Sequence, residues 1–492
     1  MSQAFPPAPT AADSRDTRMR AVLLVAVTLS AVYTVHVIID ILRPHLGYEE
    51  GHALVGWLNP PLKGQPSPPF GWYRVSFWCY VLSLPAASAF WLLSRRTGHQ
   101  RTHWQAAAAV VLLLPYPVWM LDTLTRNITY LLLCLPSTAY ALWLVHRMQR
   151  FSRLPVPALL ATAGWGAVVG AGFGGSMNQW WTDYAYNYLS PDNGALTLVD
   201  LARTKLQVMS GSVVSAGVFE ELGKGAGVAI AFLLLRRHVD NVVSGIVLGA
   251  ATGVGFNLVE SAQYMALHDG ASASTQYFLR QSLGLMAAHM AFTAAIGASF
   301  GIARQLRDKR TRRIAISCGF GIAIAAHFAN DVFISAYSRG KQEWFDPSPT
   351  VDLLVLTPLA FLVLQGPLVL LYLLLLRRGT RDQAAALAVE LAAEAATGYG
   401  AVTQDDVPVL LHPARRFYLR LKALRHGGIT AYQHLGRLHQ AQLRLGMARW
   451  HRSRAEYDPT TPDEHTLRQH VISVQHQPCP STTSPRRPQA VT

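Results

Sequence analysis

The sequence predicts an all-α fold, a polytopic transmembrane helix bundle of about ten spans followed by a basic helical and partly disordered tail. The 492 residues are 51% hydrophobic but only 14% charged, whereas soluble domains carry about 25% charged residues. The apolar residues fall in runs of roughly 20, the length that crosses ~30 Å of hydrocarbon. Arg and Lys gather between these runs, as they do in the inner loops of membrane proteins.

Each predicted span is an apolar run bounded by charged or turn-forming residues. The first run is too long for the apolar region of a signal peptide, and no A-x-A site follows it, so we expect it to remain as a span. The spans are residues 21–42, 73–94, 104–123, 128–146, 155–176, 211–235, 242–266, 283–303, 313–337 and 352–376.

Arginine-rich connections follow every second span. Arg95 and Arg96 come after the second span and Arg236 and Arg237 after the sixth, whereas the intervening connections are poor in Arg and Lys. This alternation predicts that both termini are cytoplasmic. The preference for Arg over Lys suggests a bacterial cell membrane as the location.

Composition changes along the chain predict five segments. The tail alternates Arg with Leu, Tyr and His, which indicates basic amphipathic helices on the inner leaflet, and its last part is rich in Pro, Thr, Ser and Gln. The segments are a cytoplasmic N-terminus (1–20), N-terminal spans (21–154), a membrane domain rich in buried polar residues (155–378), a cytoplasmic helical tail (379–456, with a short helix at 382–396) and a disordered C-terminus (457–492).

The net charge of +15 predicts anionic lipid at the cytoplasmic face as a partner. No recognised nucleic-acid motif accompanies the charge, so we expect no nucleic-acid binding. The four cysteines include no CxxC pair, which argues against a disulfide framework or a thiolate zinc site.

The most informative feature is a set of polar residues inside four of the spans. One charged residue at the centre of a membrane helix costs about 2.5–3.5 kcal/mol, so a shared buried site is the natural hypothesis. With the orientation above, all four sets fall in the outer half of the bilayer. The residues are Glu220, Glu221, Lys224, Glu260, His289, His327 and Asn330.

Helical spacing allows these groups to meet. Lys224 is four residues from Glu220 and three from Glu221, so it can reach either carboxylate. GxxxG pairs such as Gly249/Gly253 and Gly297/Gly301 favour close approach of the helices.

These residue types suit hydrolysis of an amide. A buried carboxylate beside water is a general base, and a His or Asn opposite it can stabilise an oxyanion. Alternatively Glu260, His289 and His327 hold a divalent metal such as zinc, since two His and one Glu form a known catalytic zinc set. Buried charge is also typical of an ion- or proton-coupled transporter, and an inactive membrane scaffold is the third alternative.

The motifs resemble those of the PrsW family of intramembrane proteases, distant relatives of the CAAX-processing and Abi proteases. The resemblance covers roughly residues 160–376, with four motifs in order. They are EExxK at 220–224, GFxxxE at 255–260 with the aromatic Tyr264, HxxxTxxxG at 289–297 and HxxN at 327–330.

The resemblance implies a peptidase that cleaves membrane-anchored proteins, and one role of the family is clipping an anti-sigma factor. It therefore implies that 155–378 is the catalytic domain and that the substrate is a single-pass membrane protein. The implied catalytic residues are Glu220, Glu221, Lys224, Glu260, His289, His327 and Asn330. Neither the use of a metal nor the oligomeric state follows from the sequence.

Overall fold

The computed structural model describes residues 11–42, 72–98, 100–188, 214–267, 271–454 and 461–477. Helices make up the secondary structure of these ranges, and no strand occurs within them. The all-α prediction is therefore confirmed. The predictions for residues 1–10 and 478–492 lie outside the described residues.

Eight helical segments of the described chain are long and apolar enough to cross a membrane, or nine if the pair α4 and α5, bent by 46°, counts as one span. The chain is thus a multi-pass membrane protein. The helices before residue 189 are α1 (Ala11–Leu42), α3 (Trp72–Arg96), α4 (Arg101–Leu113), α5 (Pro115–Arg126), α6 (Ile128–Met148), α7 (Val156–Gly164), the π-helix η1 (Trp165–Gly170) and α8 (Ala171–Tyr188).

The predicted span at 211–235 is not among these apolar segments. Its described part forms the π-helix η2 (Ala216–Glu220) and α10 (Glu221–Leu234). It differs from the other spans because two carboxylates and an ammonium, at Glu220, Glu221 and Lys224, lie within one turn. These three charges, and not a lack of apolar residues, therefore set this helix apart from the other spans.

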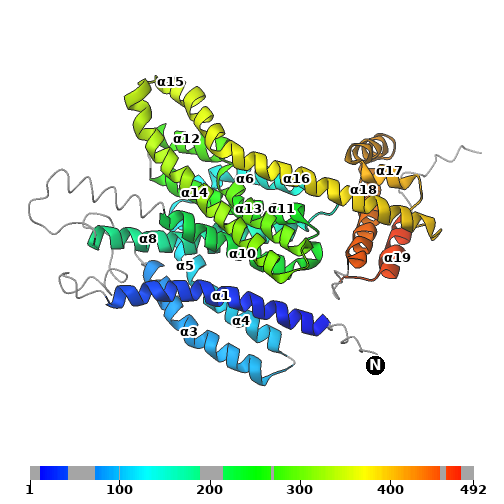
Figure 1. Cartoon of the computed structure of the whole chain (residues 1–492), viewed down its shortest axis with the longest axis horizontal. Helices are drawn as coiled ribbons and strands as arrows, with labels where there is room; N and C mark the ends of the chain where they lie inside the picture. Colours follow the sequence, from blue (N-terminus) through cyan, green and yellow to red (C-terminus); the bar gives the residue numbers. More distant parts are fainter. Residues whose placement is uncertain are drawn as a thin grey trace, which may run out of the picture.

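Helix α11 lies at the centre of the bundle, buried along nearly its whole length. It packs against α6, α7, α10 and α13, and α13 packs in turn against α14. Figure 1 shows α1, α3 and α4 together along one side of this core. The bounds of the later helices are η3 (Arg236–His238), α11 (Val242–Ala266), α12 (Ala271–Phe278), η4 (Leu279–Leu283), α13 (Ala288–Gln305), α14 (Lys309–Phe345), α15 (Pro349–Val351) and η5 (Asp352–Leu356).

Glycines bring the backbones of α11 and α13 into direct contact, as the GxxxG pairs predict. A methyl group added at Gly249 would overlap the carbonyl oxygen of Thr293, and one at Gly253 would overlap that of His289. From the other helix, Gly297 lies against the carbonyl of Gly245. This contact fixes the register of α13 on α11, and with it the height of His289.

The tail packs around the end of a single long helix, α16 (Thr357–Ala396). Sequence analysis separated a span ending at 376 from a short helix at 382–396, but the helix is continuous. Gly379 packs against Val242, and its carbonyl accepts a 2.8 Å hydrogen bond from Asn241 Nδ2. This contact joins α16 to the start of α11 at the point where the sequence of α16 changes from apolar to polar.

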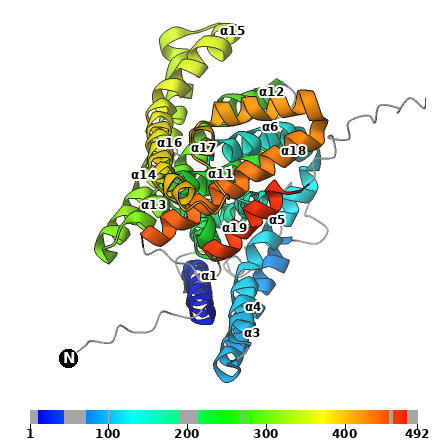
Figure 2. The same cartoon turned by 90° about the vertical axis from the view of Figure 1, so that its right-hand side faces the viewer.

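Three further helices, α17 (Asp406–Leu411), α18 (Pro413–Ser453) and α19 (Glu464–Gln475), complete the tail at one end of the bundle (Figures 1 and 2). α18 is interrupted at Gly428, where φ is 69°. The disorder predicted for 457–492 is not found at α19, because Leu467 and Val471 are buried against Leu445 of α18. The few apolar residues of α19 are too sparse to predict a helix in a polar sequence, but they are enough to pack α19 against α18.

We expect Gly249→Ala to destabilise the fold, because the new methyl group must push α13 away from α11. Overpacking of this kind costs about 1–3 kcal/mol. Thermal unfolding of the purified chain in detergent measures the effect. The matched control is Gly321→Ala in α14, where a methyl group meets no atom within 4 Å and helix propensity improves. Equal unfolding temperatures for the two variants would contradict the close packing.

Candidate active site

Four helices bring the predicted residues together. Glu220 ends the π-helix η2 and Glu221 begins α10, so the two carboxylates lie at a change of helical geometry, a feature that is frequent at functional sites. Glu260 comes from α11, His289 from α13 and His327 from α14. Because these side chains contact one another, they lie at one level of the bundle, as the sequence predicted.

The ammonium of Lys224 is the centre of the cluster. Its Nζ lies 2.6 Å from Glu221 Oε1 and 3.4 Å from Glu220 Oε2. It is also 3.2 Å from His289 Nδ1 and 3.9 Å from the centre of the Phe256 ring. The side chain is fully buried, so these contacts replace the water that an ammonium otherwise requires.

The two adjacent glutamates have different surroundings. Glu221 is 0% exposed, and its oxygens contact Lys224, His327 Nδ1 at 3.0 Å and Thr293 Oγ1 at 3.4 Å. Glu220 is 6% exposed and has fewer close partners. Its Oε1 accepts a 2.8 Å hydrogen bond from Asn178 Nδ2, and its Oε2 lies 3.8 Å from His327 Nε2. Glu220 is therefore the less constrained carboxylate.

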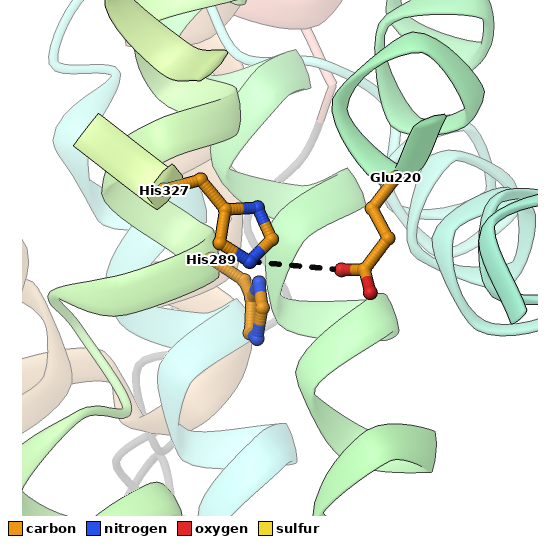
Figure 3. A group of neighbouring side chains, drawn as sticks. All are labelled: Glu220, His289 and His327. Atoms are coloured by element: carbon orange, nitrogen blue, oxygen red, sulfur yellow. Dashed lines mark ion pairs between the residues drawn. The ribbon is translucent and has the colours of Figure 1, made fainter. Parts of the chain in front are cut away.

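Glu220, His289 and His327 could hold a metal ion together. One ligand atom from each lies within 4.8 Å of the others, and all three residues are buried. Figure 3 shows both imidazoles beside the carboxylate, with the Glu220–His327 ion pair drawn as a dashed line. The predicted set contained Glu260 in place of Glu220.

The second nitrogen of each imidazole contacts another carboxylate. His289 Nε2 pairs with Glu260 Oε2, and His327 Nδ1 lies 3.0 Å from Glu221 Oε1. Metal-binding histidines usually make such a contact, because it fixes the ring and increases its basicity. The donor set and its surroundings therefore fit a divalent metal. Lys224, 3.2 Å from His289 Nδ1, is the cation with which such a metal would compete.

An arginine that sequence analysis missed holds Glu260. Arg280 in η4 donates a 2.8 Å hydrogen bond to Glu260 Oε2, and its guanidinium lies 3.5 Å from the centre of the Tyr264 ring. The sequence placed Arg280 in a connection between two spans. Its one signal was a lone cation in a connection whose other charged residue is Asp269, which is too weak to indicate a role.

Asn178 was missed for a similar reason, since an amide at the end of a span resembles an ordinary interfacial residue. Ser215 Oγ donates a 3.0 Å hydrogen bond to its Oδ1, which orients the amide toward Glu220. Gly174, one turn earlier in α8, has no room for a side chain because Glu220 packs against it. α8 therefore forms one wall of the site.

Asn330 occupies a more distant position than the spacing of HxxN implied. Its amide donates to Asp331 Oδ1 at 3.1 Å, and its oxygen accepts from Gln365 Nε2 at 2.8 Å. Asp331 Oδ2 in turn lies 3.6 Å from His327 Nε2. Asn330 thus connects α14 to α16 behind His327, and its catalytic role remains a prediction.

The sequence of this part of the chain matches a known family. Residues 154–364 match the family model described as a PrsW family intramembrane metalloprotease. Neither a curated protein nor a solved structure matches the chain. The matched segment contains every residue of the cluster, from Asn178 to His327. Residues 154–364 are therefore similar to the intramembrane protease domain of the PrsW family.

Proposed function

We propose that the protein hydrolyses a peptide bond of a membrane-anchored protein with Glu220 as the general base. The observation that carries this proposal is the position of Glu220, a buried carboxylate facing two imidazoles and an ammonium. A carboxylate held in this way can take a proton from water as the water attacks a carbonyl. Glu221 is less suited because Lys224, His327 and Thr293 already engage it.

The neighbouring groups have separate tasks in this proposal. Lys224 balances the charge of the two carboxylates, and its ammonium also stabilises negative charge that develops on the attacked carbonyl oxygen. His289 and His327 are held by Glu260 and Glu221, so each directs its other nitrogen toward Glu220. If a divalent metal is bound instead, Glu220, His289 and His327 would hold it, with Glu220 as a ligand in place of the base, and the metal would supply polarisation of the carbonyl and acidification of water.

The setting of the reaction follows from the same assignment. We infer a single-pass membrane protein as the substrate, such as an anti-sigma factor, which enters the bundle from the bilayer. The arginine-rich connections support an orientation with both termini in the cytoplasm and the site in the outer half of a bacterial cell membrane. Anionic lipid at the inner face would bind the basic tail.

We expect Glu220→Gln to lower the cleavage rate about 10²–10⁴-fold, the usual contribution of a general base. Its unfolding temperature should change little, because the amide still accepts a hydrogen bond from Asn178. Glu221→Gln serves as the comparison, since it removes the closest partner of a buried ammonium and should destabilise the fold by about 3–5 kcal/mol. N-terminal fragments of membrane proteins in cells that express each variant report cleavage. Full cleavage by a correctly inserted Glu220→Gln chain would refute the assignment.

If a metal is used, the purified chain should retain about one zinc ion after dialysis. His289→Ala and His327→Ala should each lose it, since each removes one of three protein ligands. His412→Ala is the control, because this exposed tail residue contacts the carbonyl of Pro408 only. Elemental mass spectrometry measures the zinc content independently of activity. Zinc retained by both site variants would place the metal elsewhere, and a metal-free, active wild-type chain would favour water activated by glutamate alone.

Arg280 should act as a positioning residue through Glu260. We expect Arg280→Gln to lower the cleavage rate about 10–100-fold, the usual effect of removing a group that orients metal or catalytic ligands. Arg280→Lys should restore part of the rate because it keeps the charge. Gln276→Ala is the matched control, since Gln276 contacts Arg280 (3.3 Å) but not Glu260. Equal rates for wild type and Arg280→Gln would show that Glu260 needs no such support.

A further inference from the structure

A cavity lined by several arginines lies where the tail meets the membrane bundle, several helical turns from the protease cluster. Its volume is about 250 Å³. The connection between α6 and α7, the loop around η3, the last turn of α13, and the helices α18 and α19 all contribute to its walls. The cavity therefore forms only when the tail is packed against the membrane bundle.

Positive charge dominates the walls of this cavity. Five arginines line it against one carboxylate, Asp240, and they are Arg153, Arg237, Arg304, Arg444 and Arg452. Asp240 Oδ1 is 2.7 Å from His451 Nε2, and Arg452 pairs with Glu464 at 2.9 Å. Among the residues that the structure describes, Asp240 and Glu464 are thus paired with His451 and Arg452.

Three of the arginines have no acidic partner among the residues that the structure describes. Arg237 Nε donates to the imidazole of His238 at 3.0 Å, and Arg153 Nε donates to the backbone carbonyl of Gln149 at 3.2 Å. Arg444 is exposed and takes part in no ion pair within the described ranges. Arg153, Arg237 and Arg444 thus present guanidinium groups that an anion could bind.

Crowding of like charge extends from Arg153 to a neighbouring part of α18. Burial, with Arg147 and Arg420, lowers the pKa of Arg153. Burial, with Arg153 and Arg420, lowers the pKa of Arg416 to about 10. Repulsion between these cations destabilises the folded chain unless a bound anion offsets it. The crowding is therefore a second indication of a negatively charged ligand.

We propose that this cavity binds a phosphate-bearing anion through Arg153, Arg237 and Arg444. Guanidinium groups bind phosphate oxygens in pairs and with good geometry, and a cavity of this size admits a phosphate group with its substituent. The ligand is either the headgroup of an anionic phospholipid or a soluble phosphate compound. This site is separate from the protease cluster and does not depend on proteolysis.

The position of the cavity connects the anion to the catalytic helices. Asp240 precedes Asn241, whose side chain caps the start of α11, and Arg304 lies in the last turn of α13. Glu260 lies farther along α11, and His289 lies near the other end of α13. A ligand that ties the tail to their ends would hold the tail docked and stabilise the whole chain.

The test uses the full chain in a neutral detergent and two probes, inorganic pyrophosphate and a short-chain phosphatidylglycerol. Short-chain phosphatidylcholine controls for detergent-like effects. Calorimetric titration gives the affinity for each probe, and thermal unfolding gives the stabilisation. The variant Arg237→Gln/Arg444→Gln is compared with Arg415→Gln/Arg425→Gln, which removes two exposed arginines of the same tail that do not line the cavity.

We expect at least one probe to bind the wild type and the control alike, and to bind the cavity variant about tenfold or more weakly, since charged hydrogen bonds to phosphate are lost. Binding of pyrophosphate indicates a soluble ligand, and binding of phosphatidylglycerol alone indicates a lipid headgroup. The proposal is overturned if neither probe binds the folded wild type. It is equally overturned if both double variants lose the same affinity, because the attraction would then be diffuse.

Discussion

The buried ammonium of Lys224 is the interaction on which the rest of the membrane domain depends. Two adjacent carboxylates in an apolar bundle would be too unfavourable to bury without a cation. Lys224 contacts both of them and His289 as well. Because an ion pair inside a protein is tolerated only when its remaining polar atoms are bonded, Thr293 and His327 around Glu221 belong to the same unit. The cluster therefore dictates which helices must be neighbours.

The glycine contacts between α11 and α13 serve this cluster directly. Gly253 lies against the carbonyl of His289, and Gly249 against that of Thr293. Thus the residues that allow the backbones to meet also fix the heights of an imidazole and a hydroxyl of the site. The glycines that allow close packing and the residues of the site lie at the same turns of these helices. A substitution that moves the helices apart therefore also moves the site residues. Close backbone packing of this kind holds the side chains of a site in fixed positions.

Two carboxylates side by side in the chain have different surroundings. Glu221 is fully buried and contacts Lys224, His327 and Thr293, whereas Glu220 is slightly exposed, accepts a hydrogen bond from Asn178 and faces both imidazoles. Glu260 and Arg280 repeat the supporting arrangement on the other side, around His289. The cluster therefore consists of Glu220 with the two imidazoles and an outer layer of charged groups that contact them.

The sequence by itself determined the all-α class, the apolar spans, the motif residues and their family, because membrane burial imposes long apolar runs and makes every internal charge conspicuous. It could not distinguish the surroundings of Glu220 from those of Glu221, nor place Asn178 and Arg280 beside the cluster, because those contacts depend on distances between helices remote in the chain. It also divided α16 and missed α19, since both are stabilised by contacts of the folded tail. Only the tertiary structure decided these points. The spacing of residues along a helix determines which of them share a face, but it does not determine which residues of other helices that face contacts.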